Sequence, residues 1–96
     1  MRVVSFGHKG LRQLYEEDNA KGVPPAMADK LRKFLLALET AESVEQLGRF
    51  PGWKLHPLKG NWQGFWSLTV TGNWRFVFRY EAKANTASDI NLIDYH

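Results

Sequence analysis

The apolar residues of this chain repeat with a helical period in its first half and with a strand period in its second, which limits the possible folds. One helical stripe follows the spacing i, i+4, i+7, i+8 and i+11 and consists of Met27, Leu31, Phe34, Leu35 and Leu38. Residues 62–80 instead alternate, with Thr71-Gly72 as a tight turn between two runs. The pattern therefore predicts an α+β fold, because the helix must bury its stripe against a sheet.

The weaker patterns complete this prediction. They comprise a strand over Arg2–Phe6, a helix from about Leu11 to Asn19, Pro24 and Pro25 in the first turn of the next helix, a short helical turn at 43–46, a polar loop over Glu81–Ala87 and a last strand over Ser88–His96. We expect an N-terminal strand and a two-helix hairpin packed on one face of a small antiparallel β-sheet.

Alternation also predicts what each face of the sheet carries. Trp62 shares one side with Trp66, Leu68 and Val70, and the returning strand directs Trp74, Phe76, Phe78 and Tyr80 toward the helices. The opposite face is then open and carries Arg75 and Arg79.

Length and composition exclude several classes of protein. A chain of 96 residues forms one domain, residues 1–96, too small for two lobes or a dinucleotide-binding sheet. The absence of cysteine excludes thiolate zinc sites and Cys nucleophiles. No apolar run approaches the ~20 residues of a membrane span, and the N-terminus lacks a signal-peptide pattern, so we expect a cytoplasmic protein without a membrane partner.

The distribution of charge along the chain is more informative about a binding partner than the net charge of +3. No Asp or Glu occurs over residues 46–80, although this stretch holds five Lys and Arg residues, all four tryptophans and nine of the thirteen aromatic residues. Cations interleaved with aromatic rings suit nucleic acid, because cations neutralise phosphates and rings stack on bases. A solvated sheet face that carries Arg and Lys explains the composition equally well.

Two segments before the C-terminus carry candidate chemistry. In the extended segment 54–60, Lys54, His56 and Lys59 can face one direction, and His56 is a candidate base. In the second segment, the amide of Asn73 lies near Arg75, whose planar guanidinium can grip a phosphate.

The C-terminal Asp94-Tyr95-His96 is the third candidate. Strict alternation puts Asp94 and His96 on the side of Ile90 and Leu92, toward the core. Either the strand ends or bulges after Leu92, or the two polar residues lie beyond the edge of the core.

Together these residues meet the requirements of phosphodiester cleavage. Two imidazoles and a carboxylate can transfer protons, and Arg75 with two lysines can stabilise transition-state charge. The sequence has no recognisable Ser, Thr or Cys nucleophile motif, phosphate loop or carboxylate cluster for magnesium. Because RNA brings its own nucleophile, the 2′-hydroxyl, the set points to a ribonuclease without a metal or other cofactor.

Four motifs give the chain a family resemblance. Lys54-Leu55-His56-Pro57-Leu58-Lys59-Gly60, Gly64-Phe65-Trp66-Ser67, Asn73-Trp74-Arg75 and Asp94-Tyr95-His96 resemble those of HigB-type toxins in the RelE/ParE superfamily of bacterial toxin–antitoxin systems. The likeness covers nearly the whole chain and implies a RelE-like toxin fold. It also implies an mRNA endoribonuclease that works in the A site of the 30S ribosomal subunit and stops translation and growth.

The resemblance also implies residue roles and partners. His56 and Asp94 would take part in proton transfer, His96 would donate a proton, Arg75 and Lys59 would contact the scissile phosphate, Tyr95 would stack on or orient a nucleotide, and Asn73 would help to place Arg75 or the RNA. Lys54 and Arg79 would add RNA-binding charge. The expected partner is a HigA-type helix-turn-helix antitoxin, through which the toxin meets operator DNA only indirectly.

Two alternatives remain open at this stage. His56, Asp94 and His96 could form a metal site, although the flanking lysines would repel the ion. A toxin of ParE type that binds DNA gyrase, or an RNA-binding module, would need no chemistry. For the chain ends, we expect an N-terminal tag to be tolerated and a C-terminal tag to reduce toxicity.

Overall fold

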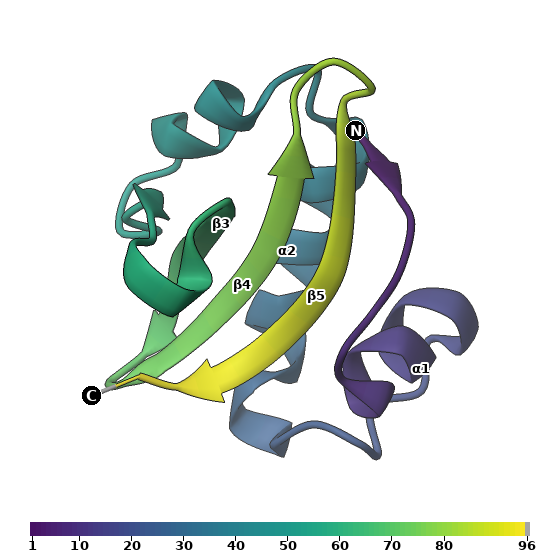
Figure 1. Cartoon of the computed structure of the whole chain (residues 1–96). Coiled ribbons are helices and arrows are strands. Elements are labelled where there is room, and N and C mark those ends of the chain that lie inside the picture. The colour runs from purple at the N-terminus through teal and green to yellow at the C-terminus, as the bar shows by residue number, and fades with distance from the viewer. Residues whose placement is uncertain (96) are drawn as a thin grey trace.

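The computed structural model describes residues 1–95 and contains one five-stranded sheet in the order β1-β5-β4-β3-β2. Its elements are β1 (Arg2–Val3), α1 (Lys9–Glu17), η1 (Pro25–Met27), α2 (Ala28–Thr40), η2 (Val44–Arg49), β2 (His56–Pro57), η3 (Gly60–Trp62), β3 (Phe65–Thr71), β4 (Trp74–Glu81) and β5 (Thr86–Asp94). α2 lies behind the sheet in Figure 1, and α1 lies at the lower right, beyond the segment that follows β1. The predicted α+β fold is confirmed.

The sheet is antiparallel except at one edge. Neighbouring strands from β2 to β5 pair antiparallel, whereas β1 pairs with β5 in parallel, with Arg2 opposite Thr86 and Val3 opposite Ala87. The predicted first strand reaches Phe6 only as an isolated bridge to Ile90. The N-terminal strand therefore joins the sheet that the second half of the chain builds.

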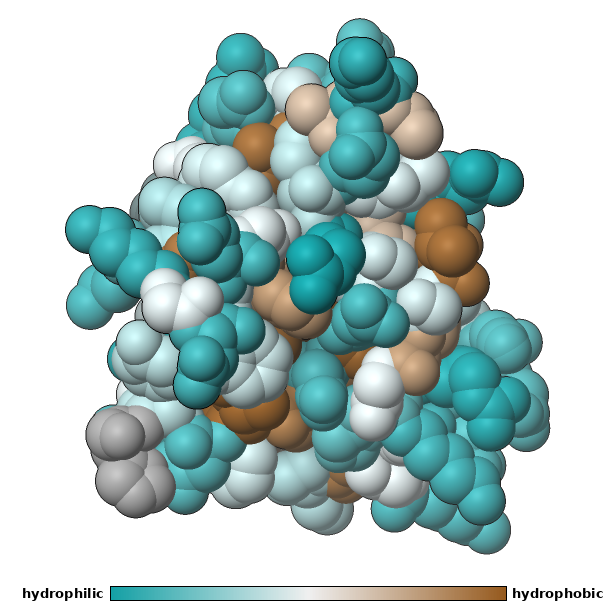
Figure 2. Space-filling model, in the orientation of Figure 1, coloured by the Kyte–Doolittle hydropathy of each residue, from teal (hydrophilic) through white to brown (hydrophobic). Residues whose placement is uncertain are grey.

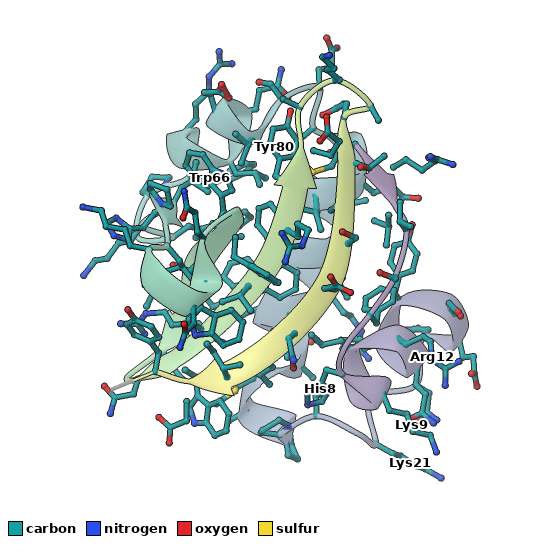
Figure 3. The ribbon with its side chains drawn as sticks, viewed as in Figure 1. His8, Lys9, Arg12, Lys21, Trp66 and Tyr80 are labelled. Carbon is teal, nitrogen blue, oxygen red and sulfur yellow. The ribbon has the colours of Figure 1, made fainter. Side chains whose placement is uncertain are left out.

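The predicted helical stripe forms the centre of the main core. All five residues of that stripe are buried, and Phe34 meets Phe76 of β4 at 5.4 Å and Trp53 at 4.7 Å between ring centroids, both edge to face. Tyr80 and Trp66 pack on the same core toward the end of β4 (Figure 3). Burying such side chains stabilises the fold by about 1.5–3 kcal/mol each before conformational entropy is counted.

The two helices begin in different ways. Pro25 opens the short turn η1, which leads directly into α2. α1 begins at Lys9, two residues before the predicted start, because His8 caps it: the Leu11 amide donates to Nδ1 of His8 at 3.1 Å. It ends at Glu17, where Asp18 turns left-handed with φ 51°.

The sheet face opposite α2 is not open in its centre, contrary to the sequence prediction. Val77 on this face is 0% exposed, because it forms a second cluster with Leu58 and Phe65, flanked by Trp62 and Ile93. Trp62 lies in η3 and packs against Phe65 at 5.1 Å, so it does not share a side with Trp66. The turn η3 breaks the alternation that the sequence prediction had carried back to residue 62.

The last strand also differs from its prediction. β5 starts at Thr86, two residues earlier than expected, and both Thr86 and Ala87 are buried. The register between β4 and β5 shifts between Val77 and Arg79, where Asp89 adopts φ 51°. This bulge lies before Ile90 and not after Leu92, and the strand continues to Asp94.

The surface of the face seen in Figure 1 is mostly hydrophilic. Figure 2 shows apolar side chains there only as separate spots between polar ones. Within residues 1–95, none of the helices has the length and apolar character needed to cross a bilayer.

Candidate active site

A hollow of about 340 Å³ lies on the sheet face opposite α2, between the segment around β2 and the β3–β4 hairpin. The residues that line it come from four parts of the chain: Lys54, Leu55, His56, Leu58, Ser67, Thr69, Arg75 and Tyr95. Four of the nine residues selected from the sequence therefore lie together. They are Lys54, His56, Arg75 and Tyr95.

Strand register explains why these residues share one face. His56 of β2 pairs with Ser67 of β3, and Thr69 of β3 pairs with Arg75 of β4. Residues directly opposite each other in an antiparallel pair direct their side chains to the same side, with Cβ atoms about 4.5–5.5 Å apart. The hairpin thus brings the imidazole and the guanidinium to one surface, although 19 positions separate them in the sequence (75 − 56).

The guanidinium of Arg75 is held by its own hairpin turn. Its Nη1 donates to the carbonyl oxygen of Gly72 at 2.7 Å and to that of Trp74 at 3.1 Å. Gly72 takes φ 53°, a conformation that favours glycine and that forms the tight turn. An arginine has five N–H donors, so the donors on Nε and Nη2 remain available for a bidentate contact with a phosphate.

The segment that carries His56 is anchored at both ends. Before it, the Thr69 amide donates to the carbonyl oxygen of Trp53 at 2.8 Å, and Trp53 stacks on Phe50 at 4.0 Å. After it, the Leu58 amide donates to the carbonyl oxygen of Phe65 at 2.8 Å. Between the anchors, Lys54 adopts φ 52°, which is unusual for a residue with a side chain. The lysine and the histidine are both exposed.

The end of β5 resolves the ambiguity over the C-terminal residues. Asp94 pairs with Trp74, whose ring packs on the main core, so alternation directs Asp94 to the α2 side of the sheet, where it is exposed beyond the core's edge. Tyr95 follows on the other side, lines the hollow and donates its amide to the carbonyl oxygen of Asn73 at 2.8 Å. The prediction for His96 concerns a residue outside those that the structure describes.

Four predicted residues do not line the hollow: Lys59, Asn73, Arg79 and Asp94. Lys59 is exposed at the start of η3, and Asn73 is exposed in the hairpin turn. Arg79 lies over the Phe65 ring at 4.6 Å and pairs through Nε with Oδ2 of Asp89 at 3.5 Å. On β4, Val77 and its apolar cluster separate Arg79 from Arg75.

The hollow has a clear electrostatic character. Its lining includes the cations Lys54 and Arg75 and the imidazole of His56, and no Asp or Glu of residues 1–95 contributes to it. It can therefore hold a phosphate between cations while an imidazole exchanges a proton. Another basic group, Lys9, Arg12 and Lys21, lies around α1 on a different part of the molecule (Figure 3).

Sequence reasoning did not select Leu55, Leu58, Ser67 and Thr69. Alternation along residues 62–70 had placed Ser67 and Thr69 together on one side, and the pairing of Thr69 with Arg75 makes that side the hollow's face. The missing information was the pairing of β3 with β2, because a two-residue strand carries no periodicity of its own.

Sequence comparison finds three matches with one consistent description. The profile of a family described as "RelE-like toxin of type II toxin-antitoxin system HigB" matches residues 4–96. "Endoribonuclease HigB" of Proteus vulgaris is 42% identical over 94 residues, which cover 98% of this chain and 99% of that protein. "Toxin HigB-1" of Vibrio cholerae is 30% identical over 78 residues, which cover 80% and 82%.

Solved structures share the fold at low sequence identity. A "YoeB/ParE toxin" from Agrobacterium tumefaciens matches with a TM-score of 0.57 and 20% identity over 100% of this chain and 99% of that one. A chain of the toxin–antitoxin complex RelBE2 from Mycobacterium tuberculosis matches with a TM-score of 0.53 and 18% identity, over 99% and 96%. The predicted RelE-like fold is thereby confirmed.

Proposed function

Since the chain belongs to the HigB family of RelE-like toxins of type II toxin–antitoxin systems, we propose that it cleaves mRNA in the A site of the ribosome without a metal cofactor. Its endoribonuclease activity and its pairing with an antitoxin follow from the family and from 42% identity over nearly the full length to an endoribonuclease. The ribosome, the mRNA substrate and the cytoplasmic site of action are the proposed part.

One observation carries the chemistry: the hollow brings His56, Arg75, Lys54 and Tyr95 together on one face. An imidazole can transfer a proton, two cations can neutralise a phosphate, and an aromatic ring can stack on a base. Tyr95 is 47% exposed, so its ring is accessible to a nucleotide. The cations also disfavour a metal ion in the hollow by charge repulsion.

In the proposed reaction the RNA supplies the nucleophile. The 2′-hydroxyl oxygen attacks the adjacent phosphorus, and the bond from phosphorus to the 5′-oxygen breaks. A base removes the 2′-hydroxyl proton and an acid protonates the leaving 5′-oxygen, which gives a 2′,3′-cyclic phosphate and a 5′-hydroxyl. We assign proton transfer in the hollow to His56. The roles expected of Asp94, which is exposed on the α2 side of the sheet, and of His96 stay predictions.

The remaining predicted residues bind and orient the RNA in this proposal. Arg75 stabilises charge on the phosphate through its free donors, and Lys54 and Lys59 add positive charge. Tyr95 stacks on a nucleotide, and Asn73 supports Tyr95 through the backbone contact and reaches the RNA from the turn. Arg79 contributes to docking, because its side chain is already engaged by Asp89 and Phe65.

The proposed antitoxin is of HigA type, with a helix-turn-helix that binds the shared operator. The toxin then meets DNA only as part of the complex. An antitoxin gene of this kind beside the toxin gene, whose product co-purifies with this chain and restores growth, is the expected observation. An antitoxin without a DNA-binding helix-turn-helix would contradict this part.

The test is cleavage of one message in two states. The purified toxin is added to an mRNA in programmed ribosomes and, at the same concentration, to the same mRNA free in solution. We expect a cut in the A-site codon only on the ribosome. Equal cleavage of free mRNA would contradict ribosome dependence, and loss of gyrase activity with no mRNA cleavage would identify a gyrase toxin instead.

A further inference from the structure

Ser67, which lines the hollow, has no role in the proposed reaction. Ser67 is 5% exposed and is one of only two buried polar residues within residues 1–95; the other, Thr86, lies in β5. Ser67 lines the hollow, so the small part of it that remains accessible faces the proposed site. A buried hydroxyl ordinarily has a hydrogen-bond partner, which makes its position informative.

The strand register places this hydroxyl beside the proposed base. Ser67 pairs directly with His56, and the two side chains leave the sheet on the same face. On its other side, Ser67 pairs with Val77 of β4, which is fully buried. By contrast His56 is exposed, so its ring has rotational freedom until something holds it.

From this arrangement we propose that Ser67 is a positioning residue that holds the His56 imidazole through a hydrogen bond during cleavage; the inference rests on the proposed function. A serine hydroxyl can both donate and accept. It can therefore accept from one ring nitrogen both when the ring is neutral and when it has taken up a proton. The other ring nitrogen is then directed at the 2′-hydroxyl, and the preferred tautomer is fixed.

The alternative role for Ser67 is that of the nucleophile, with His56 as the base that activates it. In that case Ser67 would attack phosphorus and form a covalent intermediate, as a serine activated by a neighbouring base does in other enzymes. Burial disfavours it, since Ser67 is only 5% exposed and pairs with His56, which leaves its hydroxyl little room to approach phosphorus in line. The two uses differ in whether the RNA needs its 2′-hydroxyl.

The charged and polar groups that face His56 influence how the cleavage rate depends on pH. Lys54 faces the hollow from the same segment, Arg75 from β4 and Tyr95 from the end of β5, while β3 contributes only the hydroxyls of Ser67 and Thr69. A hydrogen bond accepted from the ring favours its cationic form. Removing the acceptor should therefore move the acid limb of the pH–rate profile to lower pH.

The experiment compares four proteins in single-turnover cleavage on programmed ribosomes: wild type, Ser67→Ala, Ser67→Thr and Ser88→Ala. The last is a matched control, because Ser88 is a half-buried serine on β5 that does not line the hollow. We expect Ser67→Ala to slow cleavage about fivefold to tenfold, the effect of one neutral hydrogen bond, with unchanged ribosome binding. Ser67→Thr should restore most of the rate, and Ser88→Ala should match wild type.

Each other outcome has a defined meaning. A Ser67→Ala rate within twofold of wild type, or a loss that threonine does not rescue, would overturn the positioning role. Cleavage by wild type of a message with a single 2′-deoxy residue at the cut would overturn it in favour of a nucleophilic serine. Absence of cleavage by wild type itself would count against the proposed function and not against Ser67. Thermal melting of each variant shows that the fold is retained.

Discussion

Replacement of Arg75 by alanine should slow RNA cleavage much more than it weakens binding. Both hydrogens of Nη1 are occupied by the carbonyl oxygens of Gly72 and Trp74, which fixes the plane of the guanidinium. Of the five donors of an arginine, three remain, on Nε and Nη2. Two of these can form a bidentate contact with the phosphate, whose negative charge increases in the transition state.

The expected magnitude follows from this geometry. Removing one fixed donor from a site of developing negative charge costs about 2.7–4 kcal/mol, or about 100- to 1,000-fold in rate. Arg75→Ala should fall in this range while ribosome binding changes by less than about threefold, since the contact forms mainly in the transition state. Arg75→Lys should recover only a small part of the rate, because one ammonium cannot hold both carbonyl oxygens and form a bidentate contact.

The assay is single-turnover cleavage on programmed ribosomes together with a binding titration. Arg79→Ala is the matched control on the same strand, because its guanidinium lies over Phe65 and pairs with Asp89. We expect it to affect mainly binding. Equal losses of binding in the two variants with unchanged single-turnover rates would show that this face only docks, and would refute the reasoning.

Four further predictions concern stability, the site and the metal. Residues added before Met1 should lower the melting temperature, because the Met1 ammonium donates to the carbonyl oxygens of Leu38, Glu39 and Ala41 and a peptide amide has only one hydrogen. An unchanged melting temperature would contradict this prediction. Burial lowers the pKa of His8, so the free energy of unfolding should decrease as pH falls below about 6.5, and His8→Asn, which keeps the cap, should flatten that slope in urea titrations. Leu58→Ala should cost about 2–5 kcal/mol in urea unfolding and also reduce cleavage, because Leu58 anchors the segment that carries His56; cleavage at the wild-type rate would separate the two roles. A selective transition-metal chelator should leave cleavage unchanged while the ribosome's magnesium is maintained, and restoration of a lost activity by one metal would overturn the metal-free chemistry.

Local periodicity was sufficient to predict the helix and the hairpin of the main core. The α2 stripe and the aromatic side of β4 each repeat within one element, so their buried faces follow from the sequence. The parallel pairing of β1 with β5 has no local signal, because it depends on how the chain returns after more than eighty residues. The second cluster around Val77 was missed for the same reason, since Leu58 and Ile93 reach it from distant segments.

The candidate site could likewise be predicted only in part from the sequence. Residue chemistry selected His56 and Arg75, and the family resemblance added Tyr95; the structure places all three around one hollow. Sequence reasoning did not find Ser67, because its position beside His56 depends on the pairing of a two-residue strand. The sequence also left open on which side of the sheet Asp94 lies. In the structure Asp94 alternates with Ile90 and Leu92, because the bulge lies earlier in the strand, at Asp89.

The central claim is that the RNA supplies its own nucleophile in a hollow of imidazole and cations. The most direct measurement is cleavage of two otherwise identical messages in programmed ribosomes, one of which has a single 2′-deoxy residue at the cut. The account predicts that the all-ribose message yields a 5′ fragment ending in a 2′,3′-cyclic phosphate or its hydrolysis product, whereas the substituted message occupies the A site and stays intact. Cleavage of the substituted message at the same bond would contradict the account.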